Sequence, residues 1–141
     1  MKTLFLLPIL LLSLISFPSW GADFQKGLTA ADSGDYPTAL REWTTLAEQG
    51  HLNAQYNLGI MYERGRGVPQ DYKTAVKWYT LAAEQGYVGA QYNLGVMYDQ
   101  GHGVPQNYKT GVKWFTLAAK QGHLDAQNNL GGMYREGKGF P

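Results

Sequence analysis

The sequence predicts an all-α protein built as an α-solenoid of antiparallel helix pairs. Three observations predict this fold: a repeat every 36 residues, two helical segments in each repeat, and short glycine-rich turns that end them. Residues 54–89 match residues 90–125 at 25 of 36 positions without a gap, and residues 126–141 keep 10 of 16 positions. Such self-similarity indicates identical helical units that bury their apolar faces on one another.

The first helical segment of each unit carries small and apolar residues at the spacing of one helix face. Ala54, Leu58 and Met61 show this spacing in the first full unit. The run Gly65–Pro69 is expected to end the helix, because two glycines and a proline so close together cannot continue it. The sequence therefore predicts a turn before the second helix.

The second helical segment has a recognisable start and end. Asp71 is expected to cap its first turn, and its apolar face carries Ala75 and Ala82. Gly86 is the residue type expected in a left-handed turn after the last helical residue. In the next unit the equivalent cap is Asn107. Helices joined by such short turns are expected to lie antiparallel.

A glycine recurs inside the first helix of each unit, at Gly59, Gly95 and Gly131. Glycine inside a helix costs about 1 kcal/mol relative to alanine. Its return at the same position predicts a place where another helix crosses closely.

The N-terminus has the pattern of a secretory signal peptide. Lys2 precedes an uninterrupted apolar run over residues 4–17, and small residues follow before a polar start. We therefore expect residues 1–21 to be removed by cleavage after Gly21 or Ala22. An uncleaved N-terminal anchor is the alternative, although the run is shorter than the roughly 20 apolar residues of a spanning helix.

Composition narrows the classes of partner. Without residues 1–21 the chain keeps 11 basic and 11 acidic residues, so its formal net charge falls from +1 to 0. A nucleic-acid binder or an anionic-membrane binder would carry a clustered basic excess, so neither is expected. The chain has no cysteine, which excludes disulfides and a lipid attached to a cysteine at the cleavage site. The expected location is the periplasm or the outside of the cell.

The predicted domain plan has five parts. After the signal peptide come a degenerate first unit at 23–53, two full units at 54–89 and 90–125, and a partial unit with one helix at 126–141. In the degenerate unit Asp35, Tyr36 and Ala39 fall into register with the second helix of the later units, while the turn before them is shortened. The partial unit is expected to leave Leu130, Met133 and Tyr134 without the second helix that covers their equivalents.

These residues resemble the Sel-one-like repeat family, a relative of the tetratricopeptide repeat. The resemblance rests on residues 54–86, which read A-x-Y-x-L-G-x-x-Y-x-x-G-x-G-V-P-x-D-Y-x-x-A-x-x-W-Y-x-x-A-A-x-Q-G. It implies a right-handed superhelix of helix pairs and a non-catalytic role in binding or scaffolding other proteins. In tetratricopeptide arrays the first helices line the concave groove, so the same surface is the candidate binding site here.

Mapping the family pattern onto this chain turns one set of side chains toward that groove. The candidate peptide-binding or protein-binding residues are Asn53, Tyr56, Asn57, Ile60, Glu63, Tyr92, Asn93, Val96, Asp99, Asn129 and Arg135. The asparagines at 57, 93 and 129 occupy one repeat position, and an amide can both donate to and accept from a peptide backbone. The alternative is that each asparagine only bonds a neighbouring loop or helix end.

The sequence contains few serine, cysteine or histidine side chains that could act as nucleophiles, acid/base groups or metal ligands. Ser33 is the only serine after Gly21, and no thiol is present. The three histidines lie in separate turns, and Glu63 and Asp99 are expected to be solvated carboxylates one unit apart. We therefore expect no cofactor, no metal site and no enzyme. Two alternatives stay open: a cell-wall or β-lactam hydrolase like that suggested for cysteine-rich relatives, and a structural protein that self-associates through the open C-terminal helix.

Overall fold

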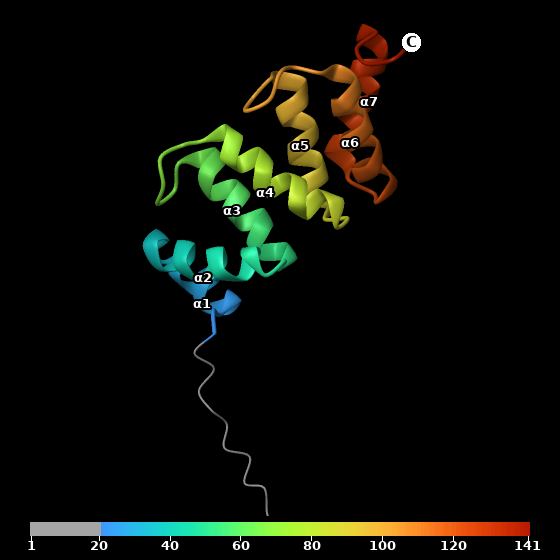
Figure 1. Cartoon of the computed structure of the whole chain (residues 1–141). Helices are drawn as coiled ribbons and strands as arrows, with labels where there is room; N and C mark the ends of the chain where they lie inside the picture. The colour runs from blue at the N-terminus through green and yellow to red at the C-terminus, as the bar shows by residue number, and fades with distance from the viewer. Residues whose placement is uncertain (1–20) are drawn as a thin grey trace, which may run out of the picture.

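The computed structural model describes residues 21–141, which form seven helices and no strand. The helices are α1 (Phe24–Asp32), α2 (Tyr36–Glu48), α3 (Leu52–Arg64), α4 (Tyr72–Glu84), α5 (Val88–Gln100), α6 (Tyr108–Lys120) and α7 (Leu124–Glu136). Each helix packs on the next along the chain, and the helix pairs follow one another from α1 to α7 (Figure 1). The predicted right-handed α-solenoid is confirmed. The predicted signal peptide lies outside the described residues, except for Gly21.

The helix caps follow the predicted chemistry. The side chain of Asp71 accepts from the backbone N–H of Thr74 at 3.1 Å, and Asn107 accepts from Thr110 at 3.0 Å. Each bond satisfies one of the backbone N–H groups that have no partner within the helix. The sequence reading missed the histidine at the start of α3: His51 caps it through Nδ1, which accepts from the backbone N–H of Ala54.

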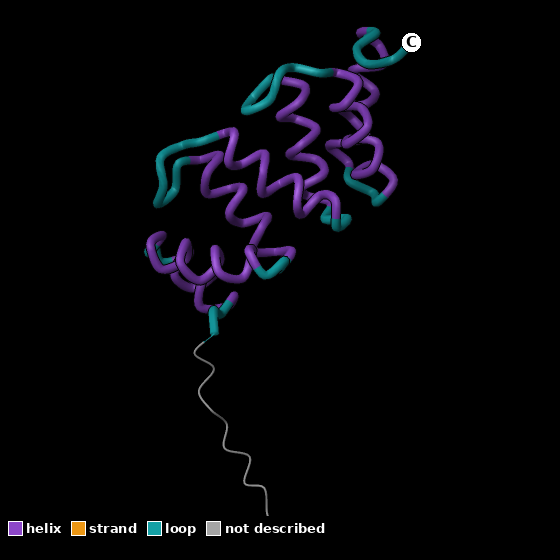
Figure 2. Tube along the Cα trace, viewed as in Figure 1, coloured by secondary structure: helices purple, strands orange, loops and turns teal. Residues whose placement is uncertain are grey.

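The glycine-rich loop of each full unit packs against the second helix of the unit before it. These loops connect α3 to α4 and α5 to α6, as Figure 2 shows. Gly103 has a φ of +71°, and a Cβ atom there would lie 2.5 Å from the carbonyl oxygen of Tyr72, the first residue of α4. A Cβ atom added at Gly67 would lie 2.5 Å from the Cβ atom of Tyr36, the first residue of α2. The second glycine of each loop is therefore needed both for its backbone angle and for the close approach.

The predicted helix crossings exist in two units of three. A side chain at Gly59 would overlap the ring of Tyr79, and one at Gly95 would overlap the ring of Phe115. The prediction is wrong for Gly131, where the nearest heavy atom to an added Cβ is a guanidinium nitrogen of Arg135 at 3.7 Å. The reason is that no described helix follows α7 to supply the equivalent ring.

The core formed by residues 21–141 consists of three clusters, and each cluster joins two successive units. The first contains Trp43, Leu58 and Trp78, the second is built around Tyr79 and Leu94, and the third contains Phe115 and Met133. Stability therefore arises largely between neighbouring units, as expected for a solenoid.

The C-terminal unit is partly covered by its own last residues. Met133 is only 6% exposed, and Phe140 packs against the same cluster and edge-on against Tyr134, with 5.5 Å between ring centroids. Tyr134 is nevertheless 73% exposed and Leu124 is 71% exposed. The expected open strip is thus confined to the outer side of α7.

Candidate functional site

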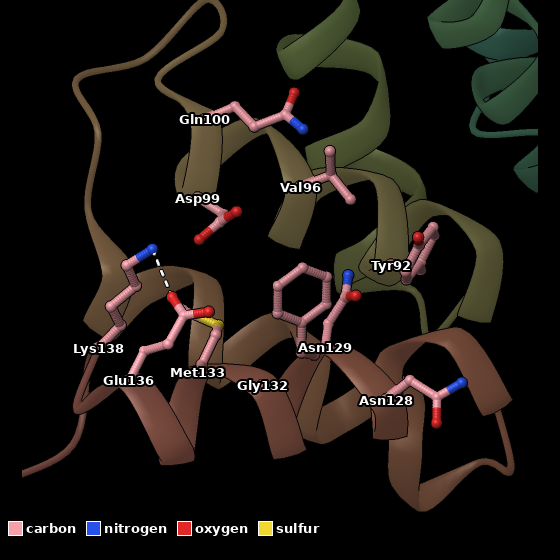
Figure 3. A pocket seen from close by; sticks show the side chains of 11 residues that line it. Tyr92, Val96, Asp99, Gln100, Asn128, Asn129, Gly132, Met133, Glu136 and Lys138 are labelled. Carbon is pink, nitrogen blue, oxygen red and sulfur yellow. Dashed lines mark ion pairs between the residues drawn. The ribbon is translucent and has the colours of Figure 1, made fainter.

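Two hollows open between the first helices of the units. The N-terminal hollow, about 200 Å³, lies between α1 and α3 and includes Leu28, Asn57 and Arg64. The C-terminal hollow, about 430 Å³, lies between α5 and α7 and is drawn in Figure 3. We use the name groove for the surface of α1, α3, α5 and α7 that contains both hollows. It is the candidate functional site.

The predicted site residues divide among these hollows. Asn57 and Ile60 line the N-terminal hollow. The residues that line the C-terminal hollow are Tyr92, Val96, Asp99 and Asn129. The remaining predicted residues, which line neither hollow, are Asn53, Tyr56, Glu63, Asn93 and Arg135. The structure therefore brings four of the predicted residues together at one place, between α5 and α7.

Sequence reasoning missed several residues that shape the hollows. Arg64 and Arg66 contribute to the N-terminal hollow, and Glu136 and Lys138 contribute to the C-terminal hollow. A comparison of equivalent positions in the repeats could have pointed to these residues. Residues 64 and 136 occupy equivalent positions two units apart and carry opposite charges, although the surrounding repeat is nearly the same.

The groove tyrosines are partly used for packing within their own unit. Tyr56 lies against Tyr87, with 4.6 Å between ring centroids, and against Tyr79 at 5.9 Å. Tyr92 stacks on His123 at 4.4 Å and contacts Phe115 at 5.7 Å. Both tyrosines remain half-buried, so one part of each ring supports the helix pair and another part faces outward.

A side-chain hydrogen bond joins α4 to α3 at a point close to α5. The hydroxyl of Tyr79 donates to the Glu63 carboxylate at 2.5 Å, and Asn93 lies beside the same hydroxyl. Burial, together with the Glu63 carboxylate, raises the pKa of Tyr79 above its usual value. The interpretation of Glu63 as a solvated carboxylate is therefore wrong, because this side chain holds a buried hydroxyl.

The three repeated asparagines, Asn57, Asn93 and Asn129, are half-buried, and the first and the last of them line the two hollows. Glutamine side-chain amides make the hydrogen bonds that connect helix ends here, within a unit and from one unit to the next. Gln85 donates to the side chain of Gln55 at 2.8 Å, and Gln55 donates to the carbonyl of Ala47 at 3.1 Å. Asn93 in turn lies within hydrogen-bond reach of the Tyr56 and Tyr79 hydroxyls, so the alternative of a structural role applies to this asparagine.

The charges at the groove change sign along the solenoid. Arg64 stands at the N-terminal hollow, Gln100 takes its place one unit later, and Glu136 takes it at the C-terminal hollow. Lys138 pairs with Glu136 at 2.7 Å and lowers the pKa of that carboxyl below its usual value. The groove is therefore electrostatically different at its two ends.

Within residues 21–141 no group of three or more His, Asp or Glu side chains is placed to hold a metal ion. The hydroxyl of Ser33 donates to the carbonyl of Ala30 at 2.9 Å, at the end of α1. The Ser33 hydroxyl thus bonds a backbone carbonyl in the last turn of α1.

Comparison with known proteins identifies the repeat. A family model described as the Sel1 repeat matches residues 52–87, 88–123 and 124–141. The chain belongs to the Sel1 repeat family. The Sel1 units so defined begin two residues before the units chosen from the sequence, at the first residues of α3, α5 and α7. Sel1 repeats generally mediate protein–protein interactions and typically serve as binding scaffolds.

Solved Sel1-type structures share the fold. A Sel1 repeat protein from Oxalobacter formigenes is 35% identical over 84% of this chain and 49% of its own, with a TM-score of 0.79. The protein c5321, a protective antigen of uropathogenic Escherichia coli with an SLR fold, is 38% identical over 85% of this chain and 30% of its own, with a TM-score of 0.72. The chain thus spans half or less of these two proteins.

A third structure is more distant. Cysteine-rich protein B of Helicobacter pylori is 25% identical over 75% of this chain and 90% of its own, with a TM-score of 0.62. A search of curated proteins found no match. None of the helices within residues 21–141 has both the length and the apolar character needed to cross a membrane.

Proposed function

We propose that this Sel1 repeat protein is exported to the bacterial envelope and there binds a protein partner through an extended segment that lies in the groove. It acts as an adaptor or scaffold and performs no catalysis. The proposal of export rests on the signal-peptide pattern of residues 1–21.

The observation that carries the binding proposal is the position of the two hollows. Both lie between first helices, and both are lined by apolar side chains together with amides and charged groups. A surface of this kind suits a peptide whose side chains enter the hollows while its backbone bonds the amides between them. The general role of Sel1 repeats in protein–protein interaction supports the same conclusion.

Blocking the groove tests this proposal. The mature chain is immobilised and used to capture proteins from an envelope extract, in parallel with the double variant Asn57→Arg, Asn129→Arg. Both positions are half-buried on the groove side, so two arginines are expected to obstruct it without removing core packing. Capture of a specific protein by the wild type, and its loss in the variant, is the expected result.

The matched control introduces the same side chain elsewhere. Leu81 on α4 is 38% exposed and lines neither hollow, so Leu81→Arg is expected to leave capture unchanged. Equal capture by the wild type and the groove variant would remove the groove from the account.

Self-association is a second candidate, favoured by the exposure of Leu124 and Tyr134 on α7. Exposed apolar residues on one helix can form an interface between copies. Light scattering across a concentration series tests it, and a constant monomer mass would dismiss it.

A further inference from the structure

We propose that the C-terminal hollow is the pocket for a lysine or arginine side chain of the bound segment, so that the partner is a basic peptide. This inference rests on the proposed function and specifies its ligand. The C-terminal hollow differs in three ways from the equivalent place one unit earlier, between α3 and α5.

The first difference is a missing hydroxyl. One unit earlier the Tyr79 hydroxyl lies beside Asn93 of α5 and donates to Glu63 of α3 at 2.5 Å. In the next unit Phe115 replaces the tyrosine, and Asp99 is one methylene shorter than Glu63. The carboxylate of Asp99 points into the C-terminal hollow in Figure 3. This aspartate therefore lacks the donor that its counterpart has.

The second difference is a missing side chain on the opposite wall. The position occupied by Ile60 in α3 and by Val96 in α5 is Gly132 in α7. The nearest heavy atom to a Cβ added at Gly132 is a guanidinium nitrogen of Arg135 at 3.9 Å, an ordinary contact, so a side chain could be placed there without a clash. Successive units thus carry a smaller residue at this point, and the last one leaves a hollow of about 430 Å³.

The third difference is the charge. Lys138 is engaged by Glu136 at 2.7 Å and lies over the ring of Tyr108 at 5.2 Å. None of the ion pairs found in residues 21–141 includes Asp99. Asp99 acts on Lys138 only at longer range, so its carboxylate remains available to a cation that enters the hollow.

The walls suit the rest of a long basic side chain. Tyr92 and Val96 are half-buried, line the hollow and offer apolar contact to an aliphatic stem, while Asp99 takes the charged head. A shorter acidic side chain would meet the Asp99 carboxylate and be repelled. The geometry thus points to lysine or arginine.

A selection from a random octapeptide library displayed on phage tests the inference. The wild-type mature chain is expected to enrich peptides with lysine or arginine at one fixed position. The best peptide is then synthesised, and its affinity is measured by fluorescence anisotropy. Asp99→Asn is expected to weaken binding about tenfold or more, because a charge-assisted hydrogen bond is lost.

Two further variants rebuild in the C-terminal unit the side chains found one unit earlier. The double variant Phe115→Tyr, Asp99→Glu restores the hydroxyl and its acceptor, and Gly132→Val restores the wall. The equivalent unit already holds these side chains at these positions, so folding is expected to persist, and thermal melting checks it. Each variant is expected to lose at least tenfold in affinity. Glu84→Gln, an exposed carboxylate change on α4, is expected to have no effect.

The outcomes separate the two proposals. Enriched peptides without a basic position, or a basic peptide that binds Asp99→Asn and the rebuilt variants as well as it binds the wild type, would overturn the inference and leave groove binding intact. Failure to enrich any peptide would count against groove binding itself, and with it the inference.

Discussion

The hydroxyl of Tyr79 on α4 donates a hydrogen bond to the carboxylate of Glu63 on α3 and so connects the two helices. Tyr79→Phe removes this donor and leaves a partly buried carboxylate with one partner fewer. We expect a loss of about 1 kcal/mol in the free energy of unfolding, measured by urea titration. Tyr72→Phe is the control, since the Tyr72 hydroxyl makes only an exposed bond to Gln70. Equal stability losses in the two variants would contradict the assigned role.

The same hydroxyl predicts a pH dependence. The pKa of Tyr79 is raised in the folded protein above its ordinary value of 10.0. The folded chain therefore keeps the proton where the unfolded chain releases it, so stabilisation is complete below about pH 10 and falls as the pH rises further. Unfolding titrations between pH 8 and 11 should show a steeper alkaline loss for the wild type than for Tyr79→Phe. Parallel curves would show that the hydroxyl is not responsible.

Two glycines in equivalent positions are expected to respond in opposite ways to alanine. Gly59→Ala places a methyl group in the ring of Tyr79 and should cost about 1–3 kcal/mol. Gly131→Ala meets no such ring and should raise stability by up to about 1 kcal/mol through helix propensity. Thermal melting of both variants checks the pair. Destabilisation of similar size at both positions would contradict the observed packing.

Among the helices, α7 is the one with the least support. It packs on α6, and its outer side exposes Leu124 and Tyr134, whereas α5 packs on both α4 and α6. We therefore expect backbone amides of residues 127–134 to exchange with deuterium faster than those of residues 90–98. Hydrogen exchange followed by mass spectrometry measures both segments in one experiment. Equal protection would show that the last residues of the chain support α7 more strongly than the packing suggests.

The helices and turns could be predicted from the sequence because their signals are local. The Asp71 cap and the Gly86 turn depend on residues a few positions away. The hollows could not be predicted in this way. Gly132 opens a wall only because Phe115 and Asp99, from other helices, leave the facing space unfilled. His51 was missed as a cap because histidine is a less common capping residue than aspartate or asparagine.

At the scale of the whole molecule, neighbouring units depend on one another while their exposed residues differ. Each core cluster joins two units, and the loop glycines Gly67 and Gly103 fit against the unit before. This arrangement keeps the backbone nearly constant from unit to unit. Side chains at the groove can then change without loss of the fold, as the series Arg64, Gln100 and Glu136 illustrates. Binding specificity is therefore expected to lie in the differences between units.

The most direct measurement is a map of backbone amide chemical shifts, recorded on the labelled mature chain as an enriched peptide is added. If the peptide lies in the groove, the shifted amides are expected on α1, α3, α5 and α7, with the largest changes near Asp99 and Asn129. Shifts that cluster instead on α2, α4 and α6 would contradict the central claim that the groove holds the partner.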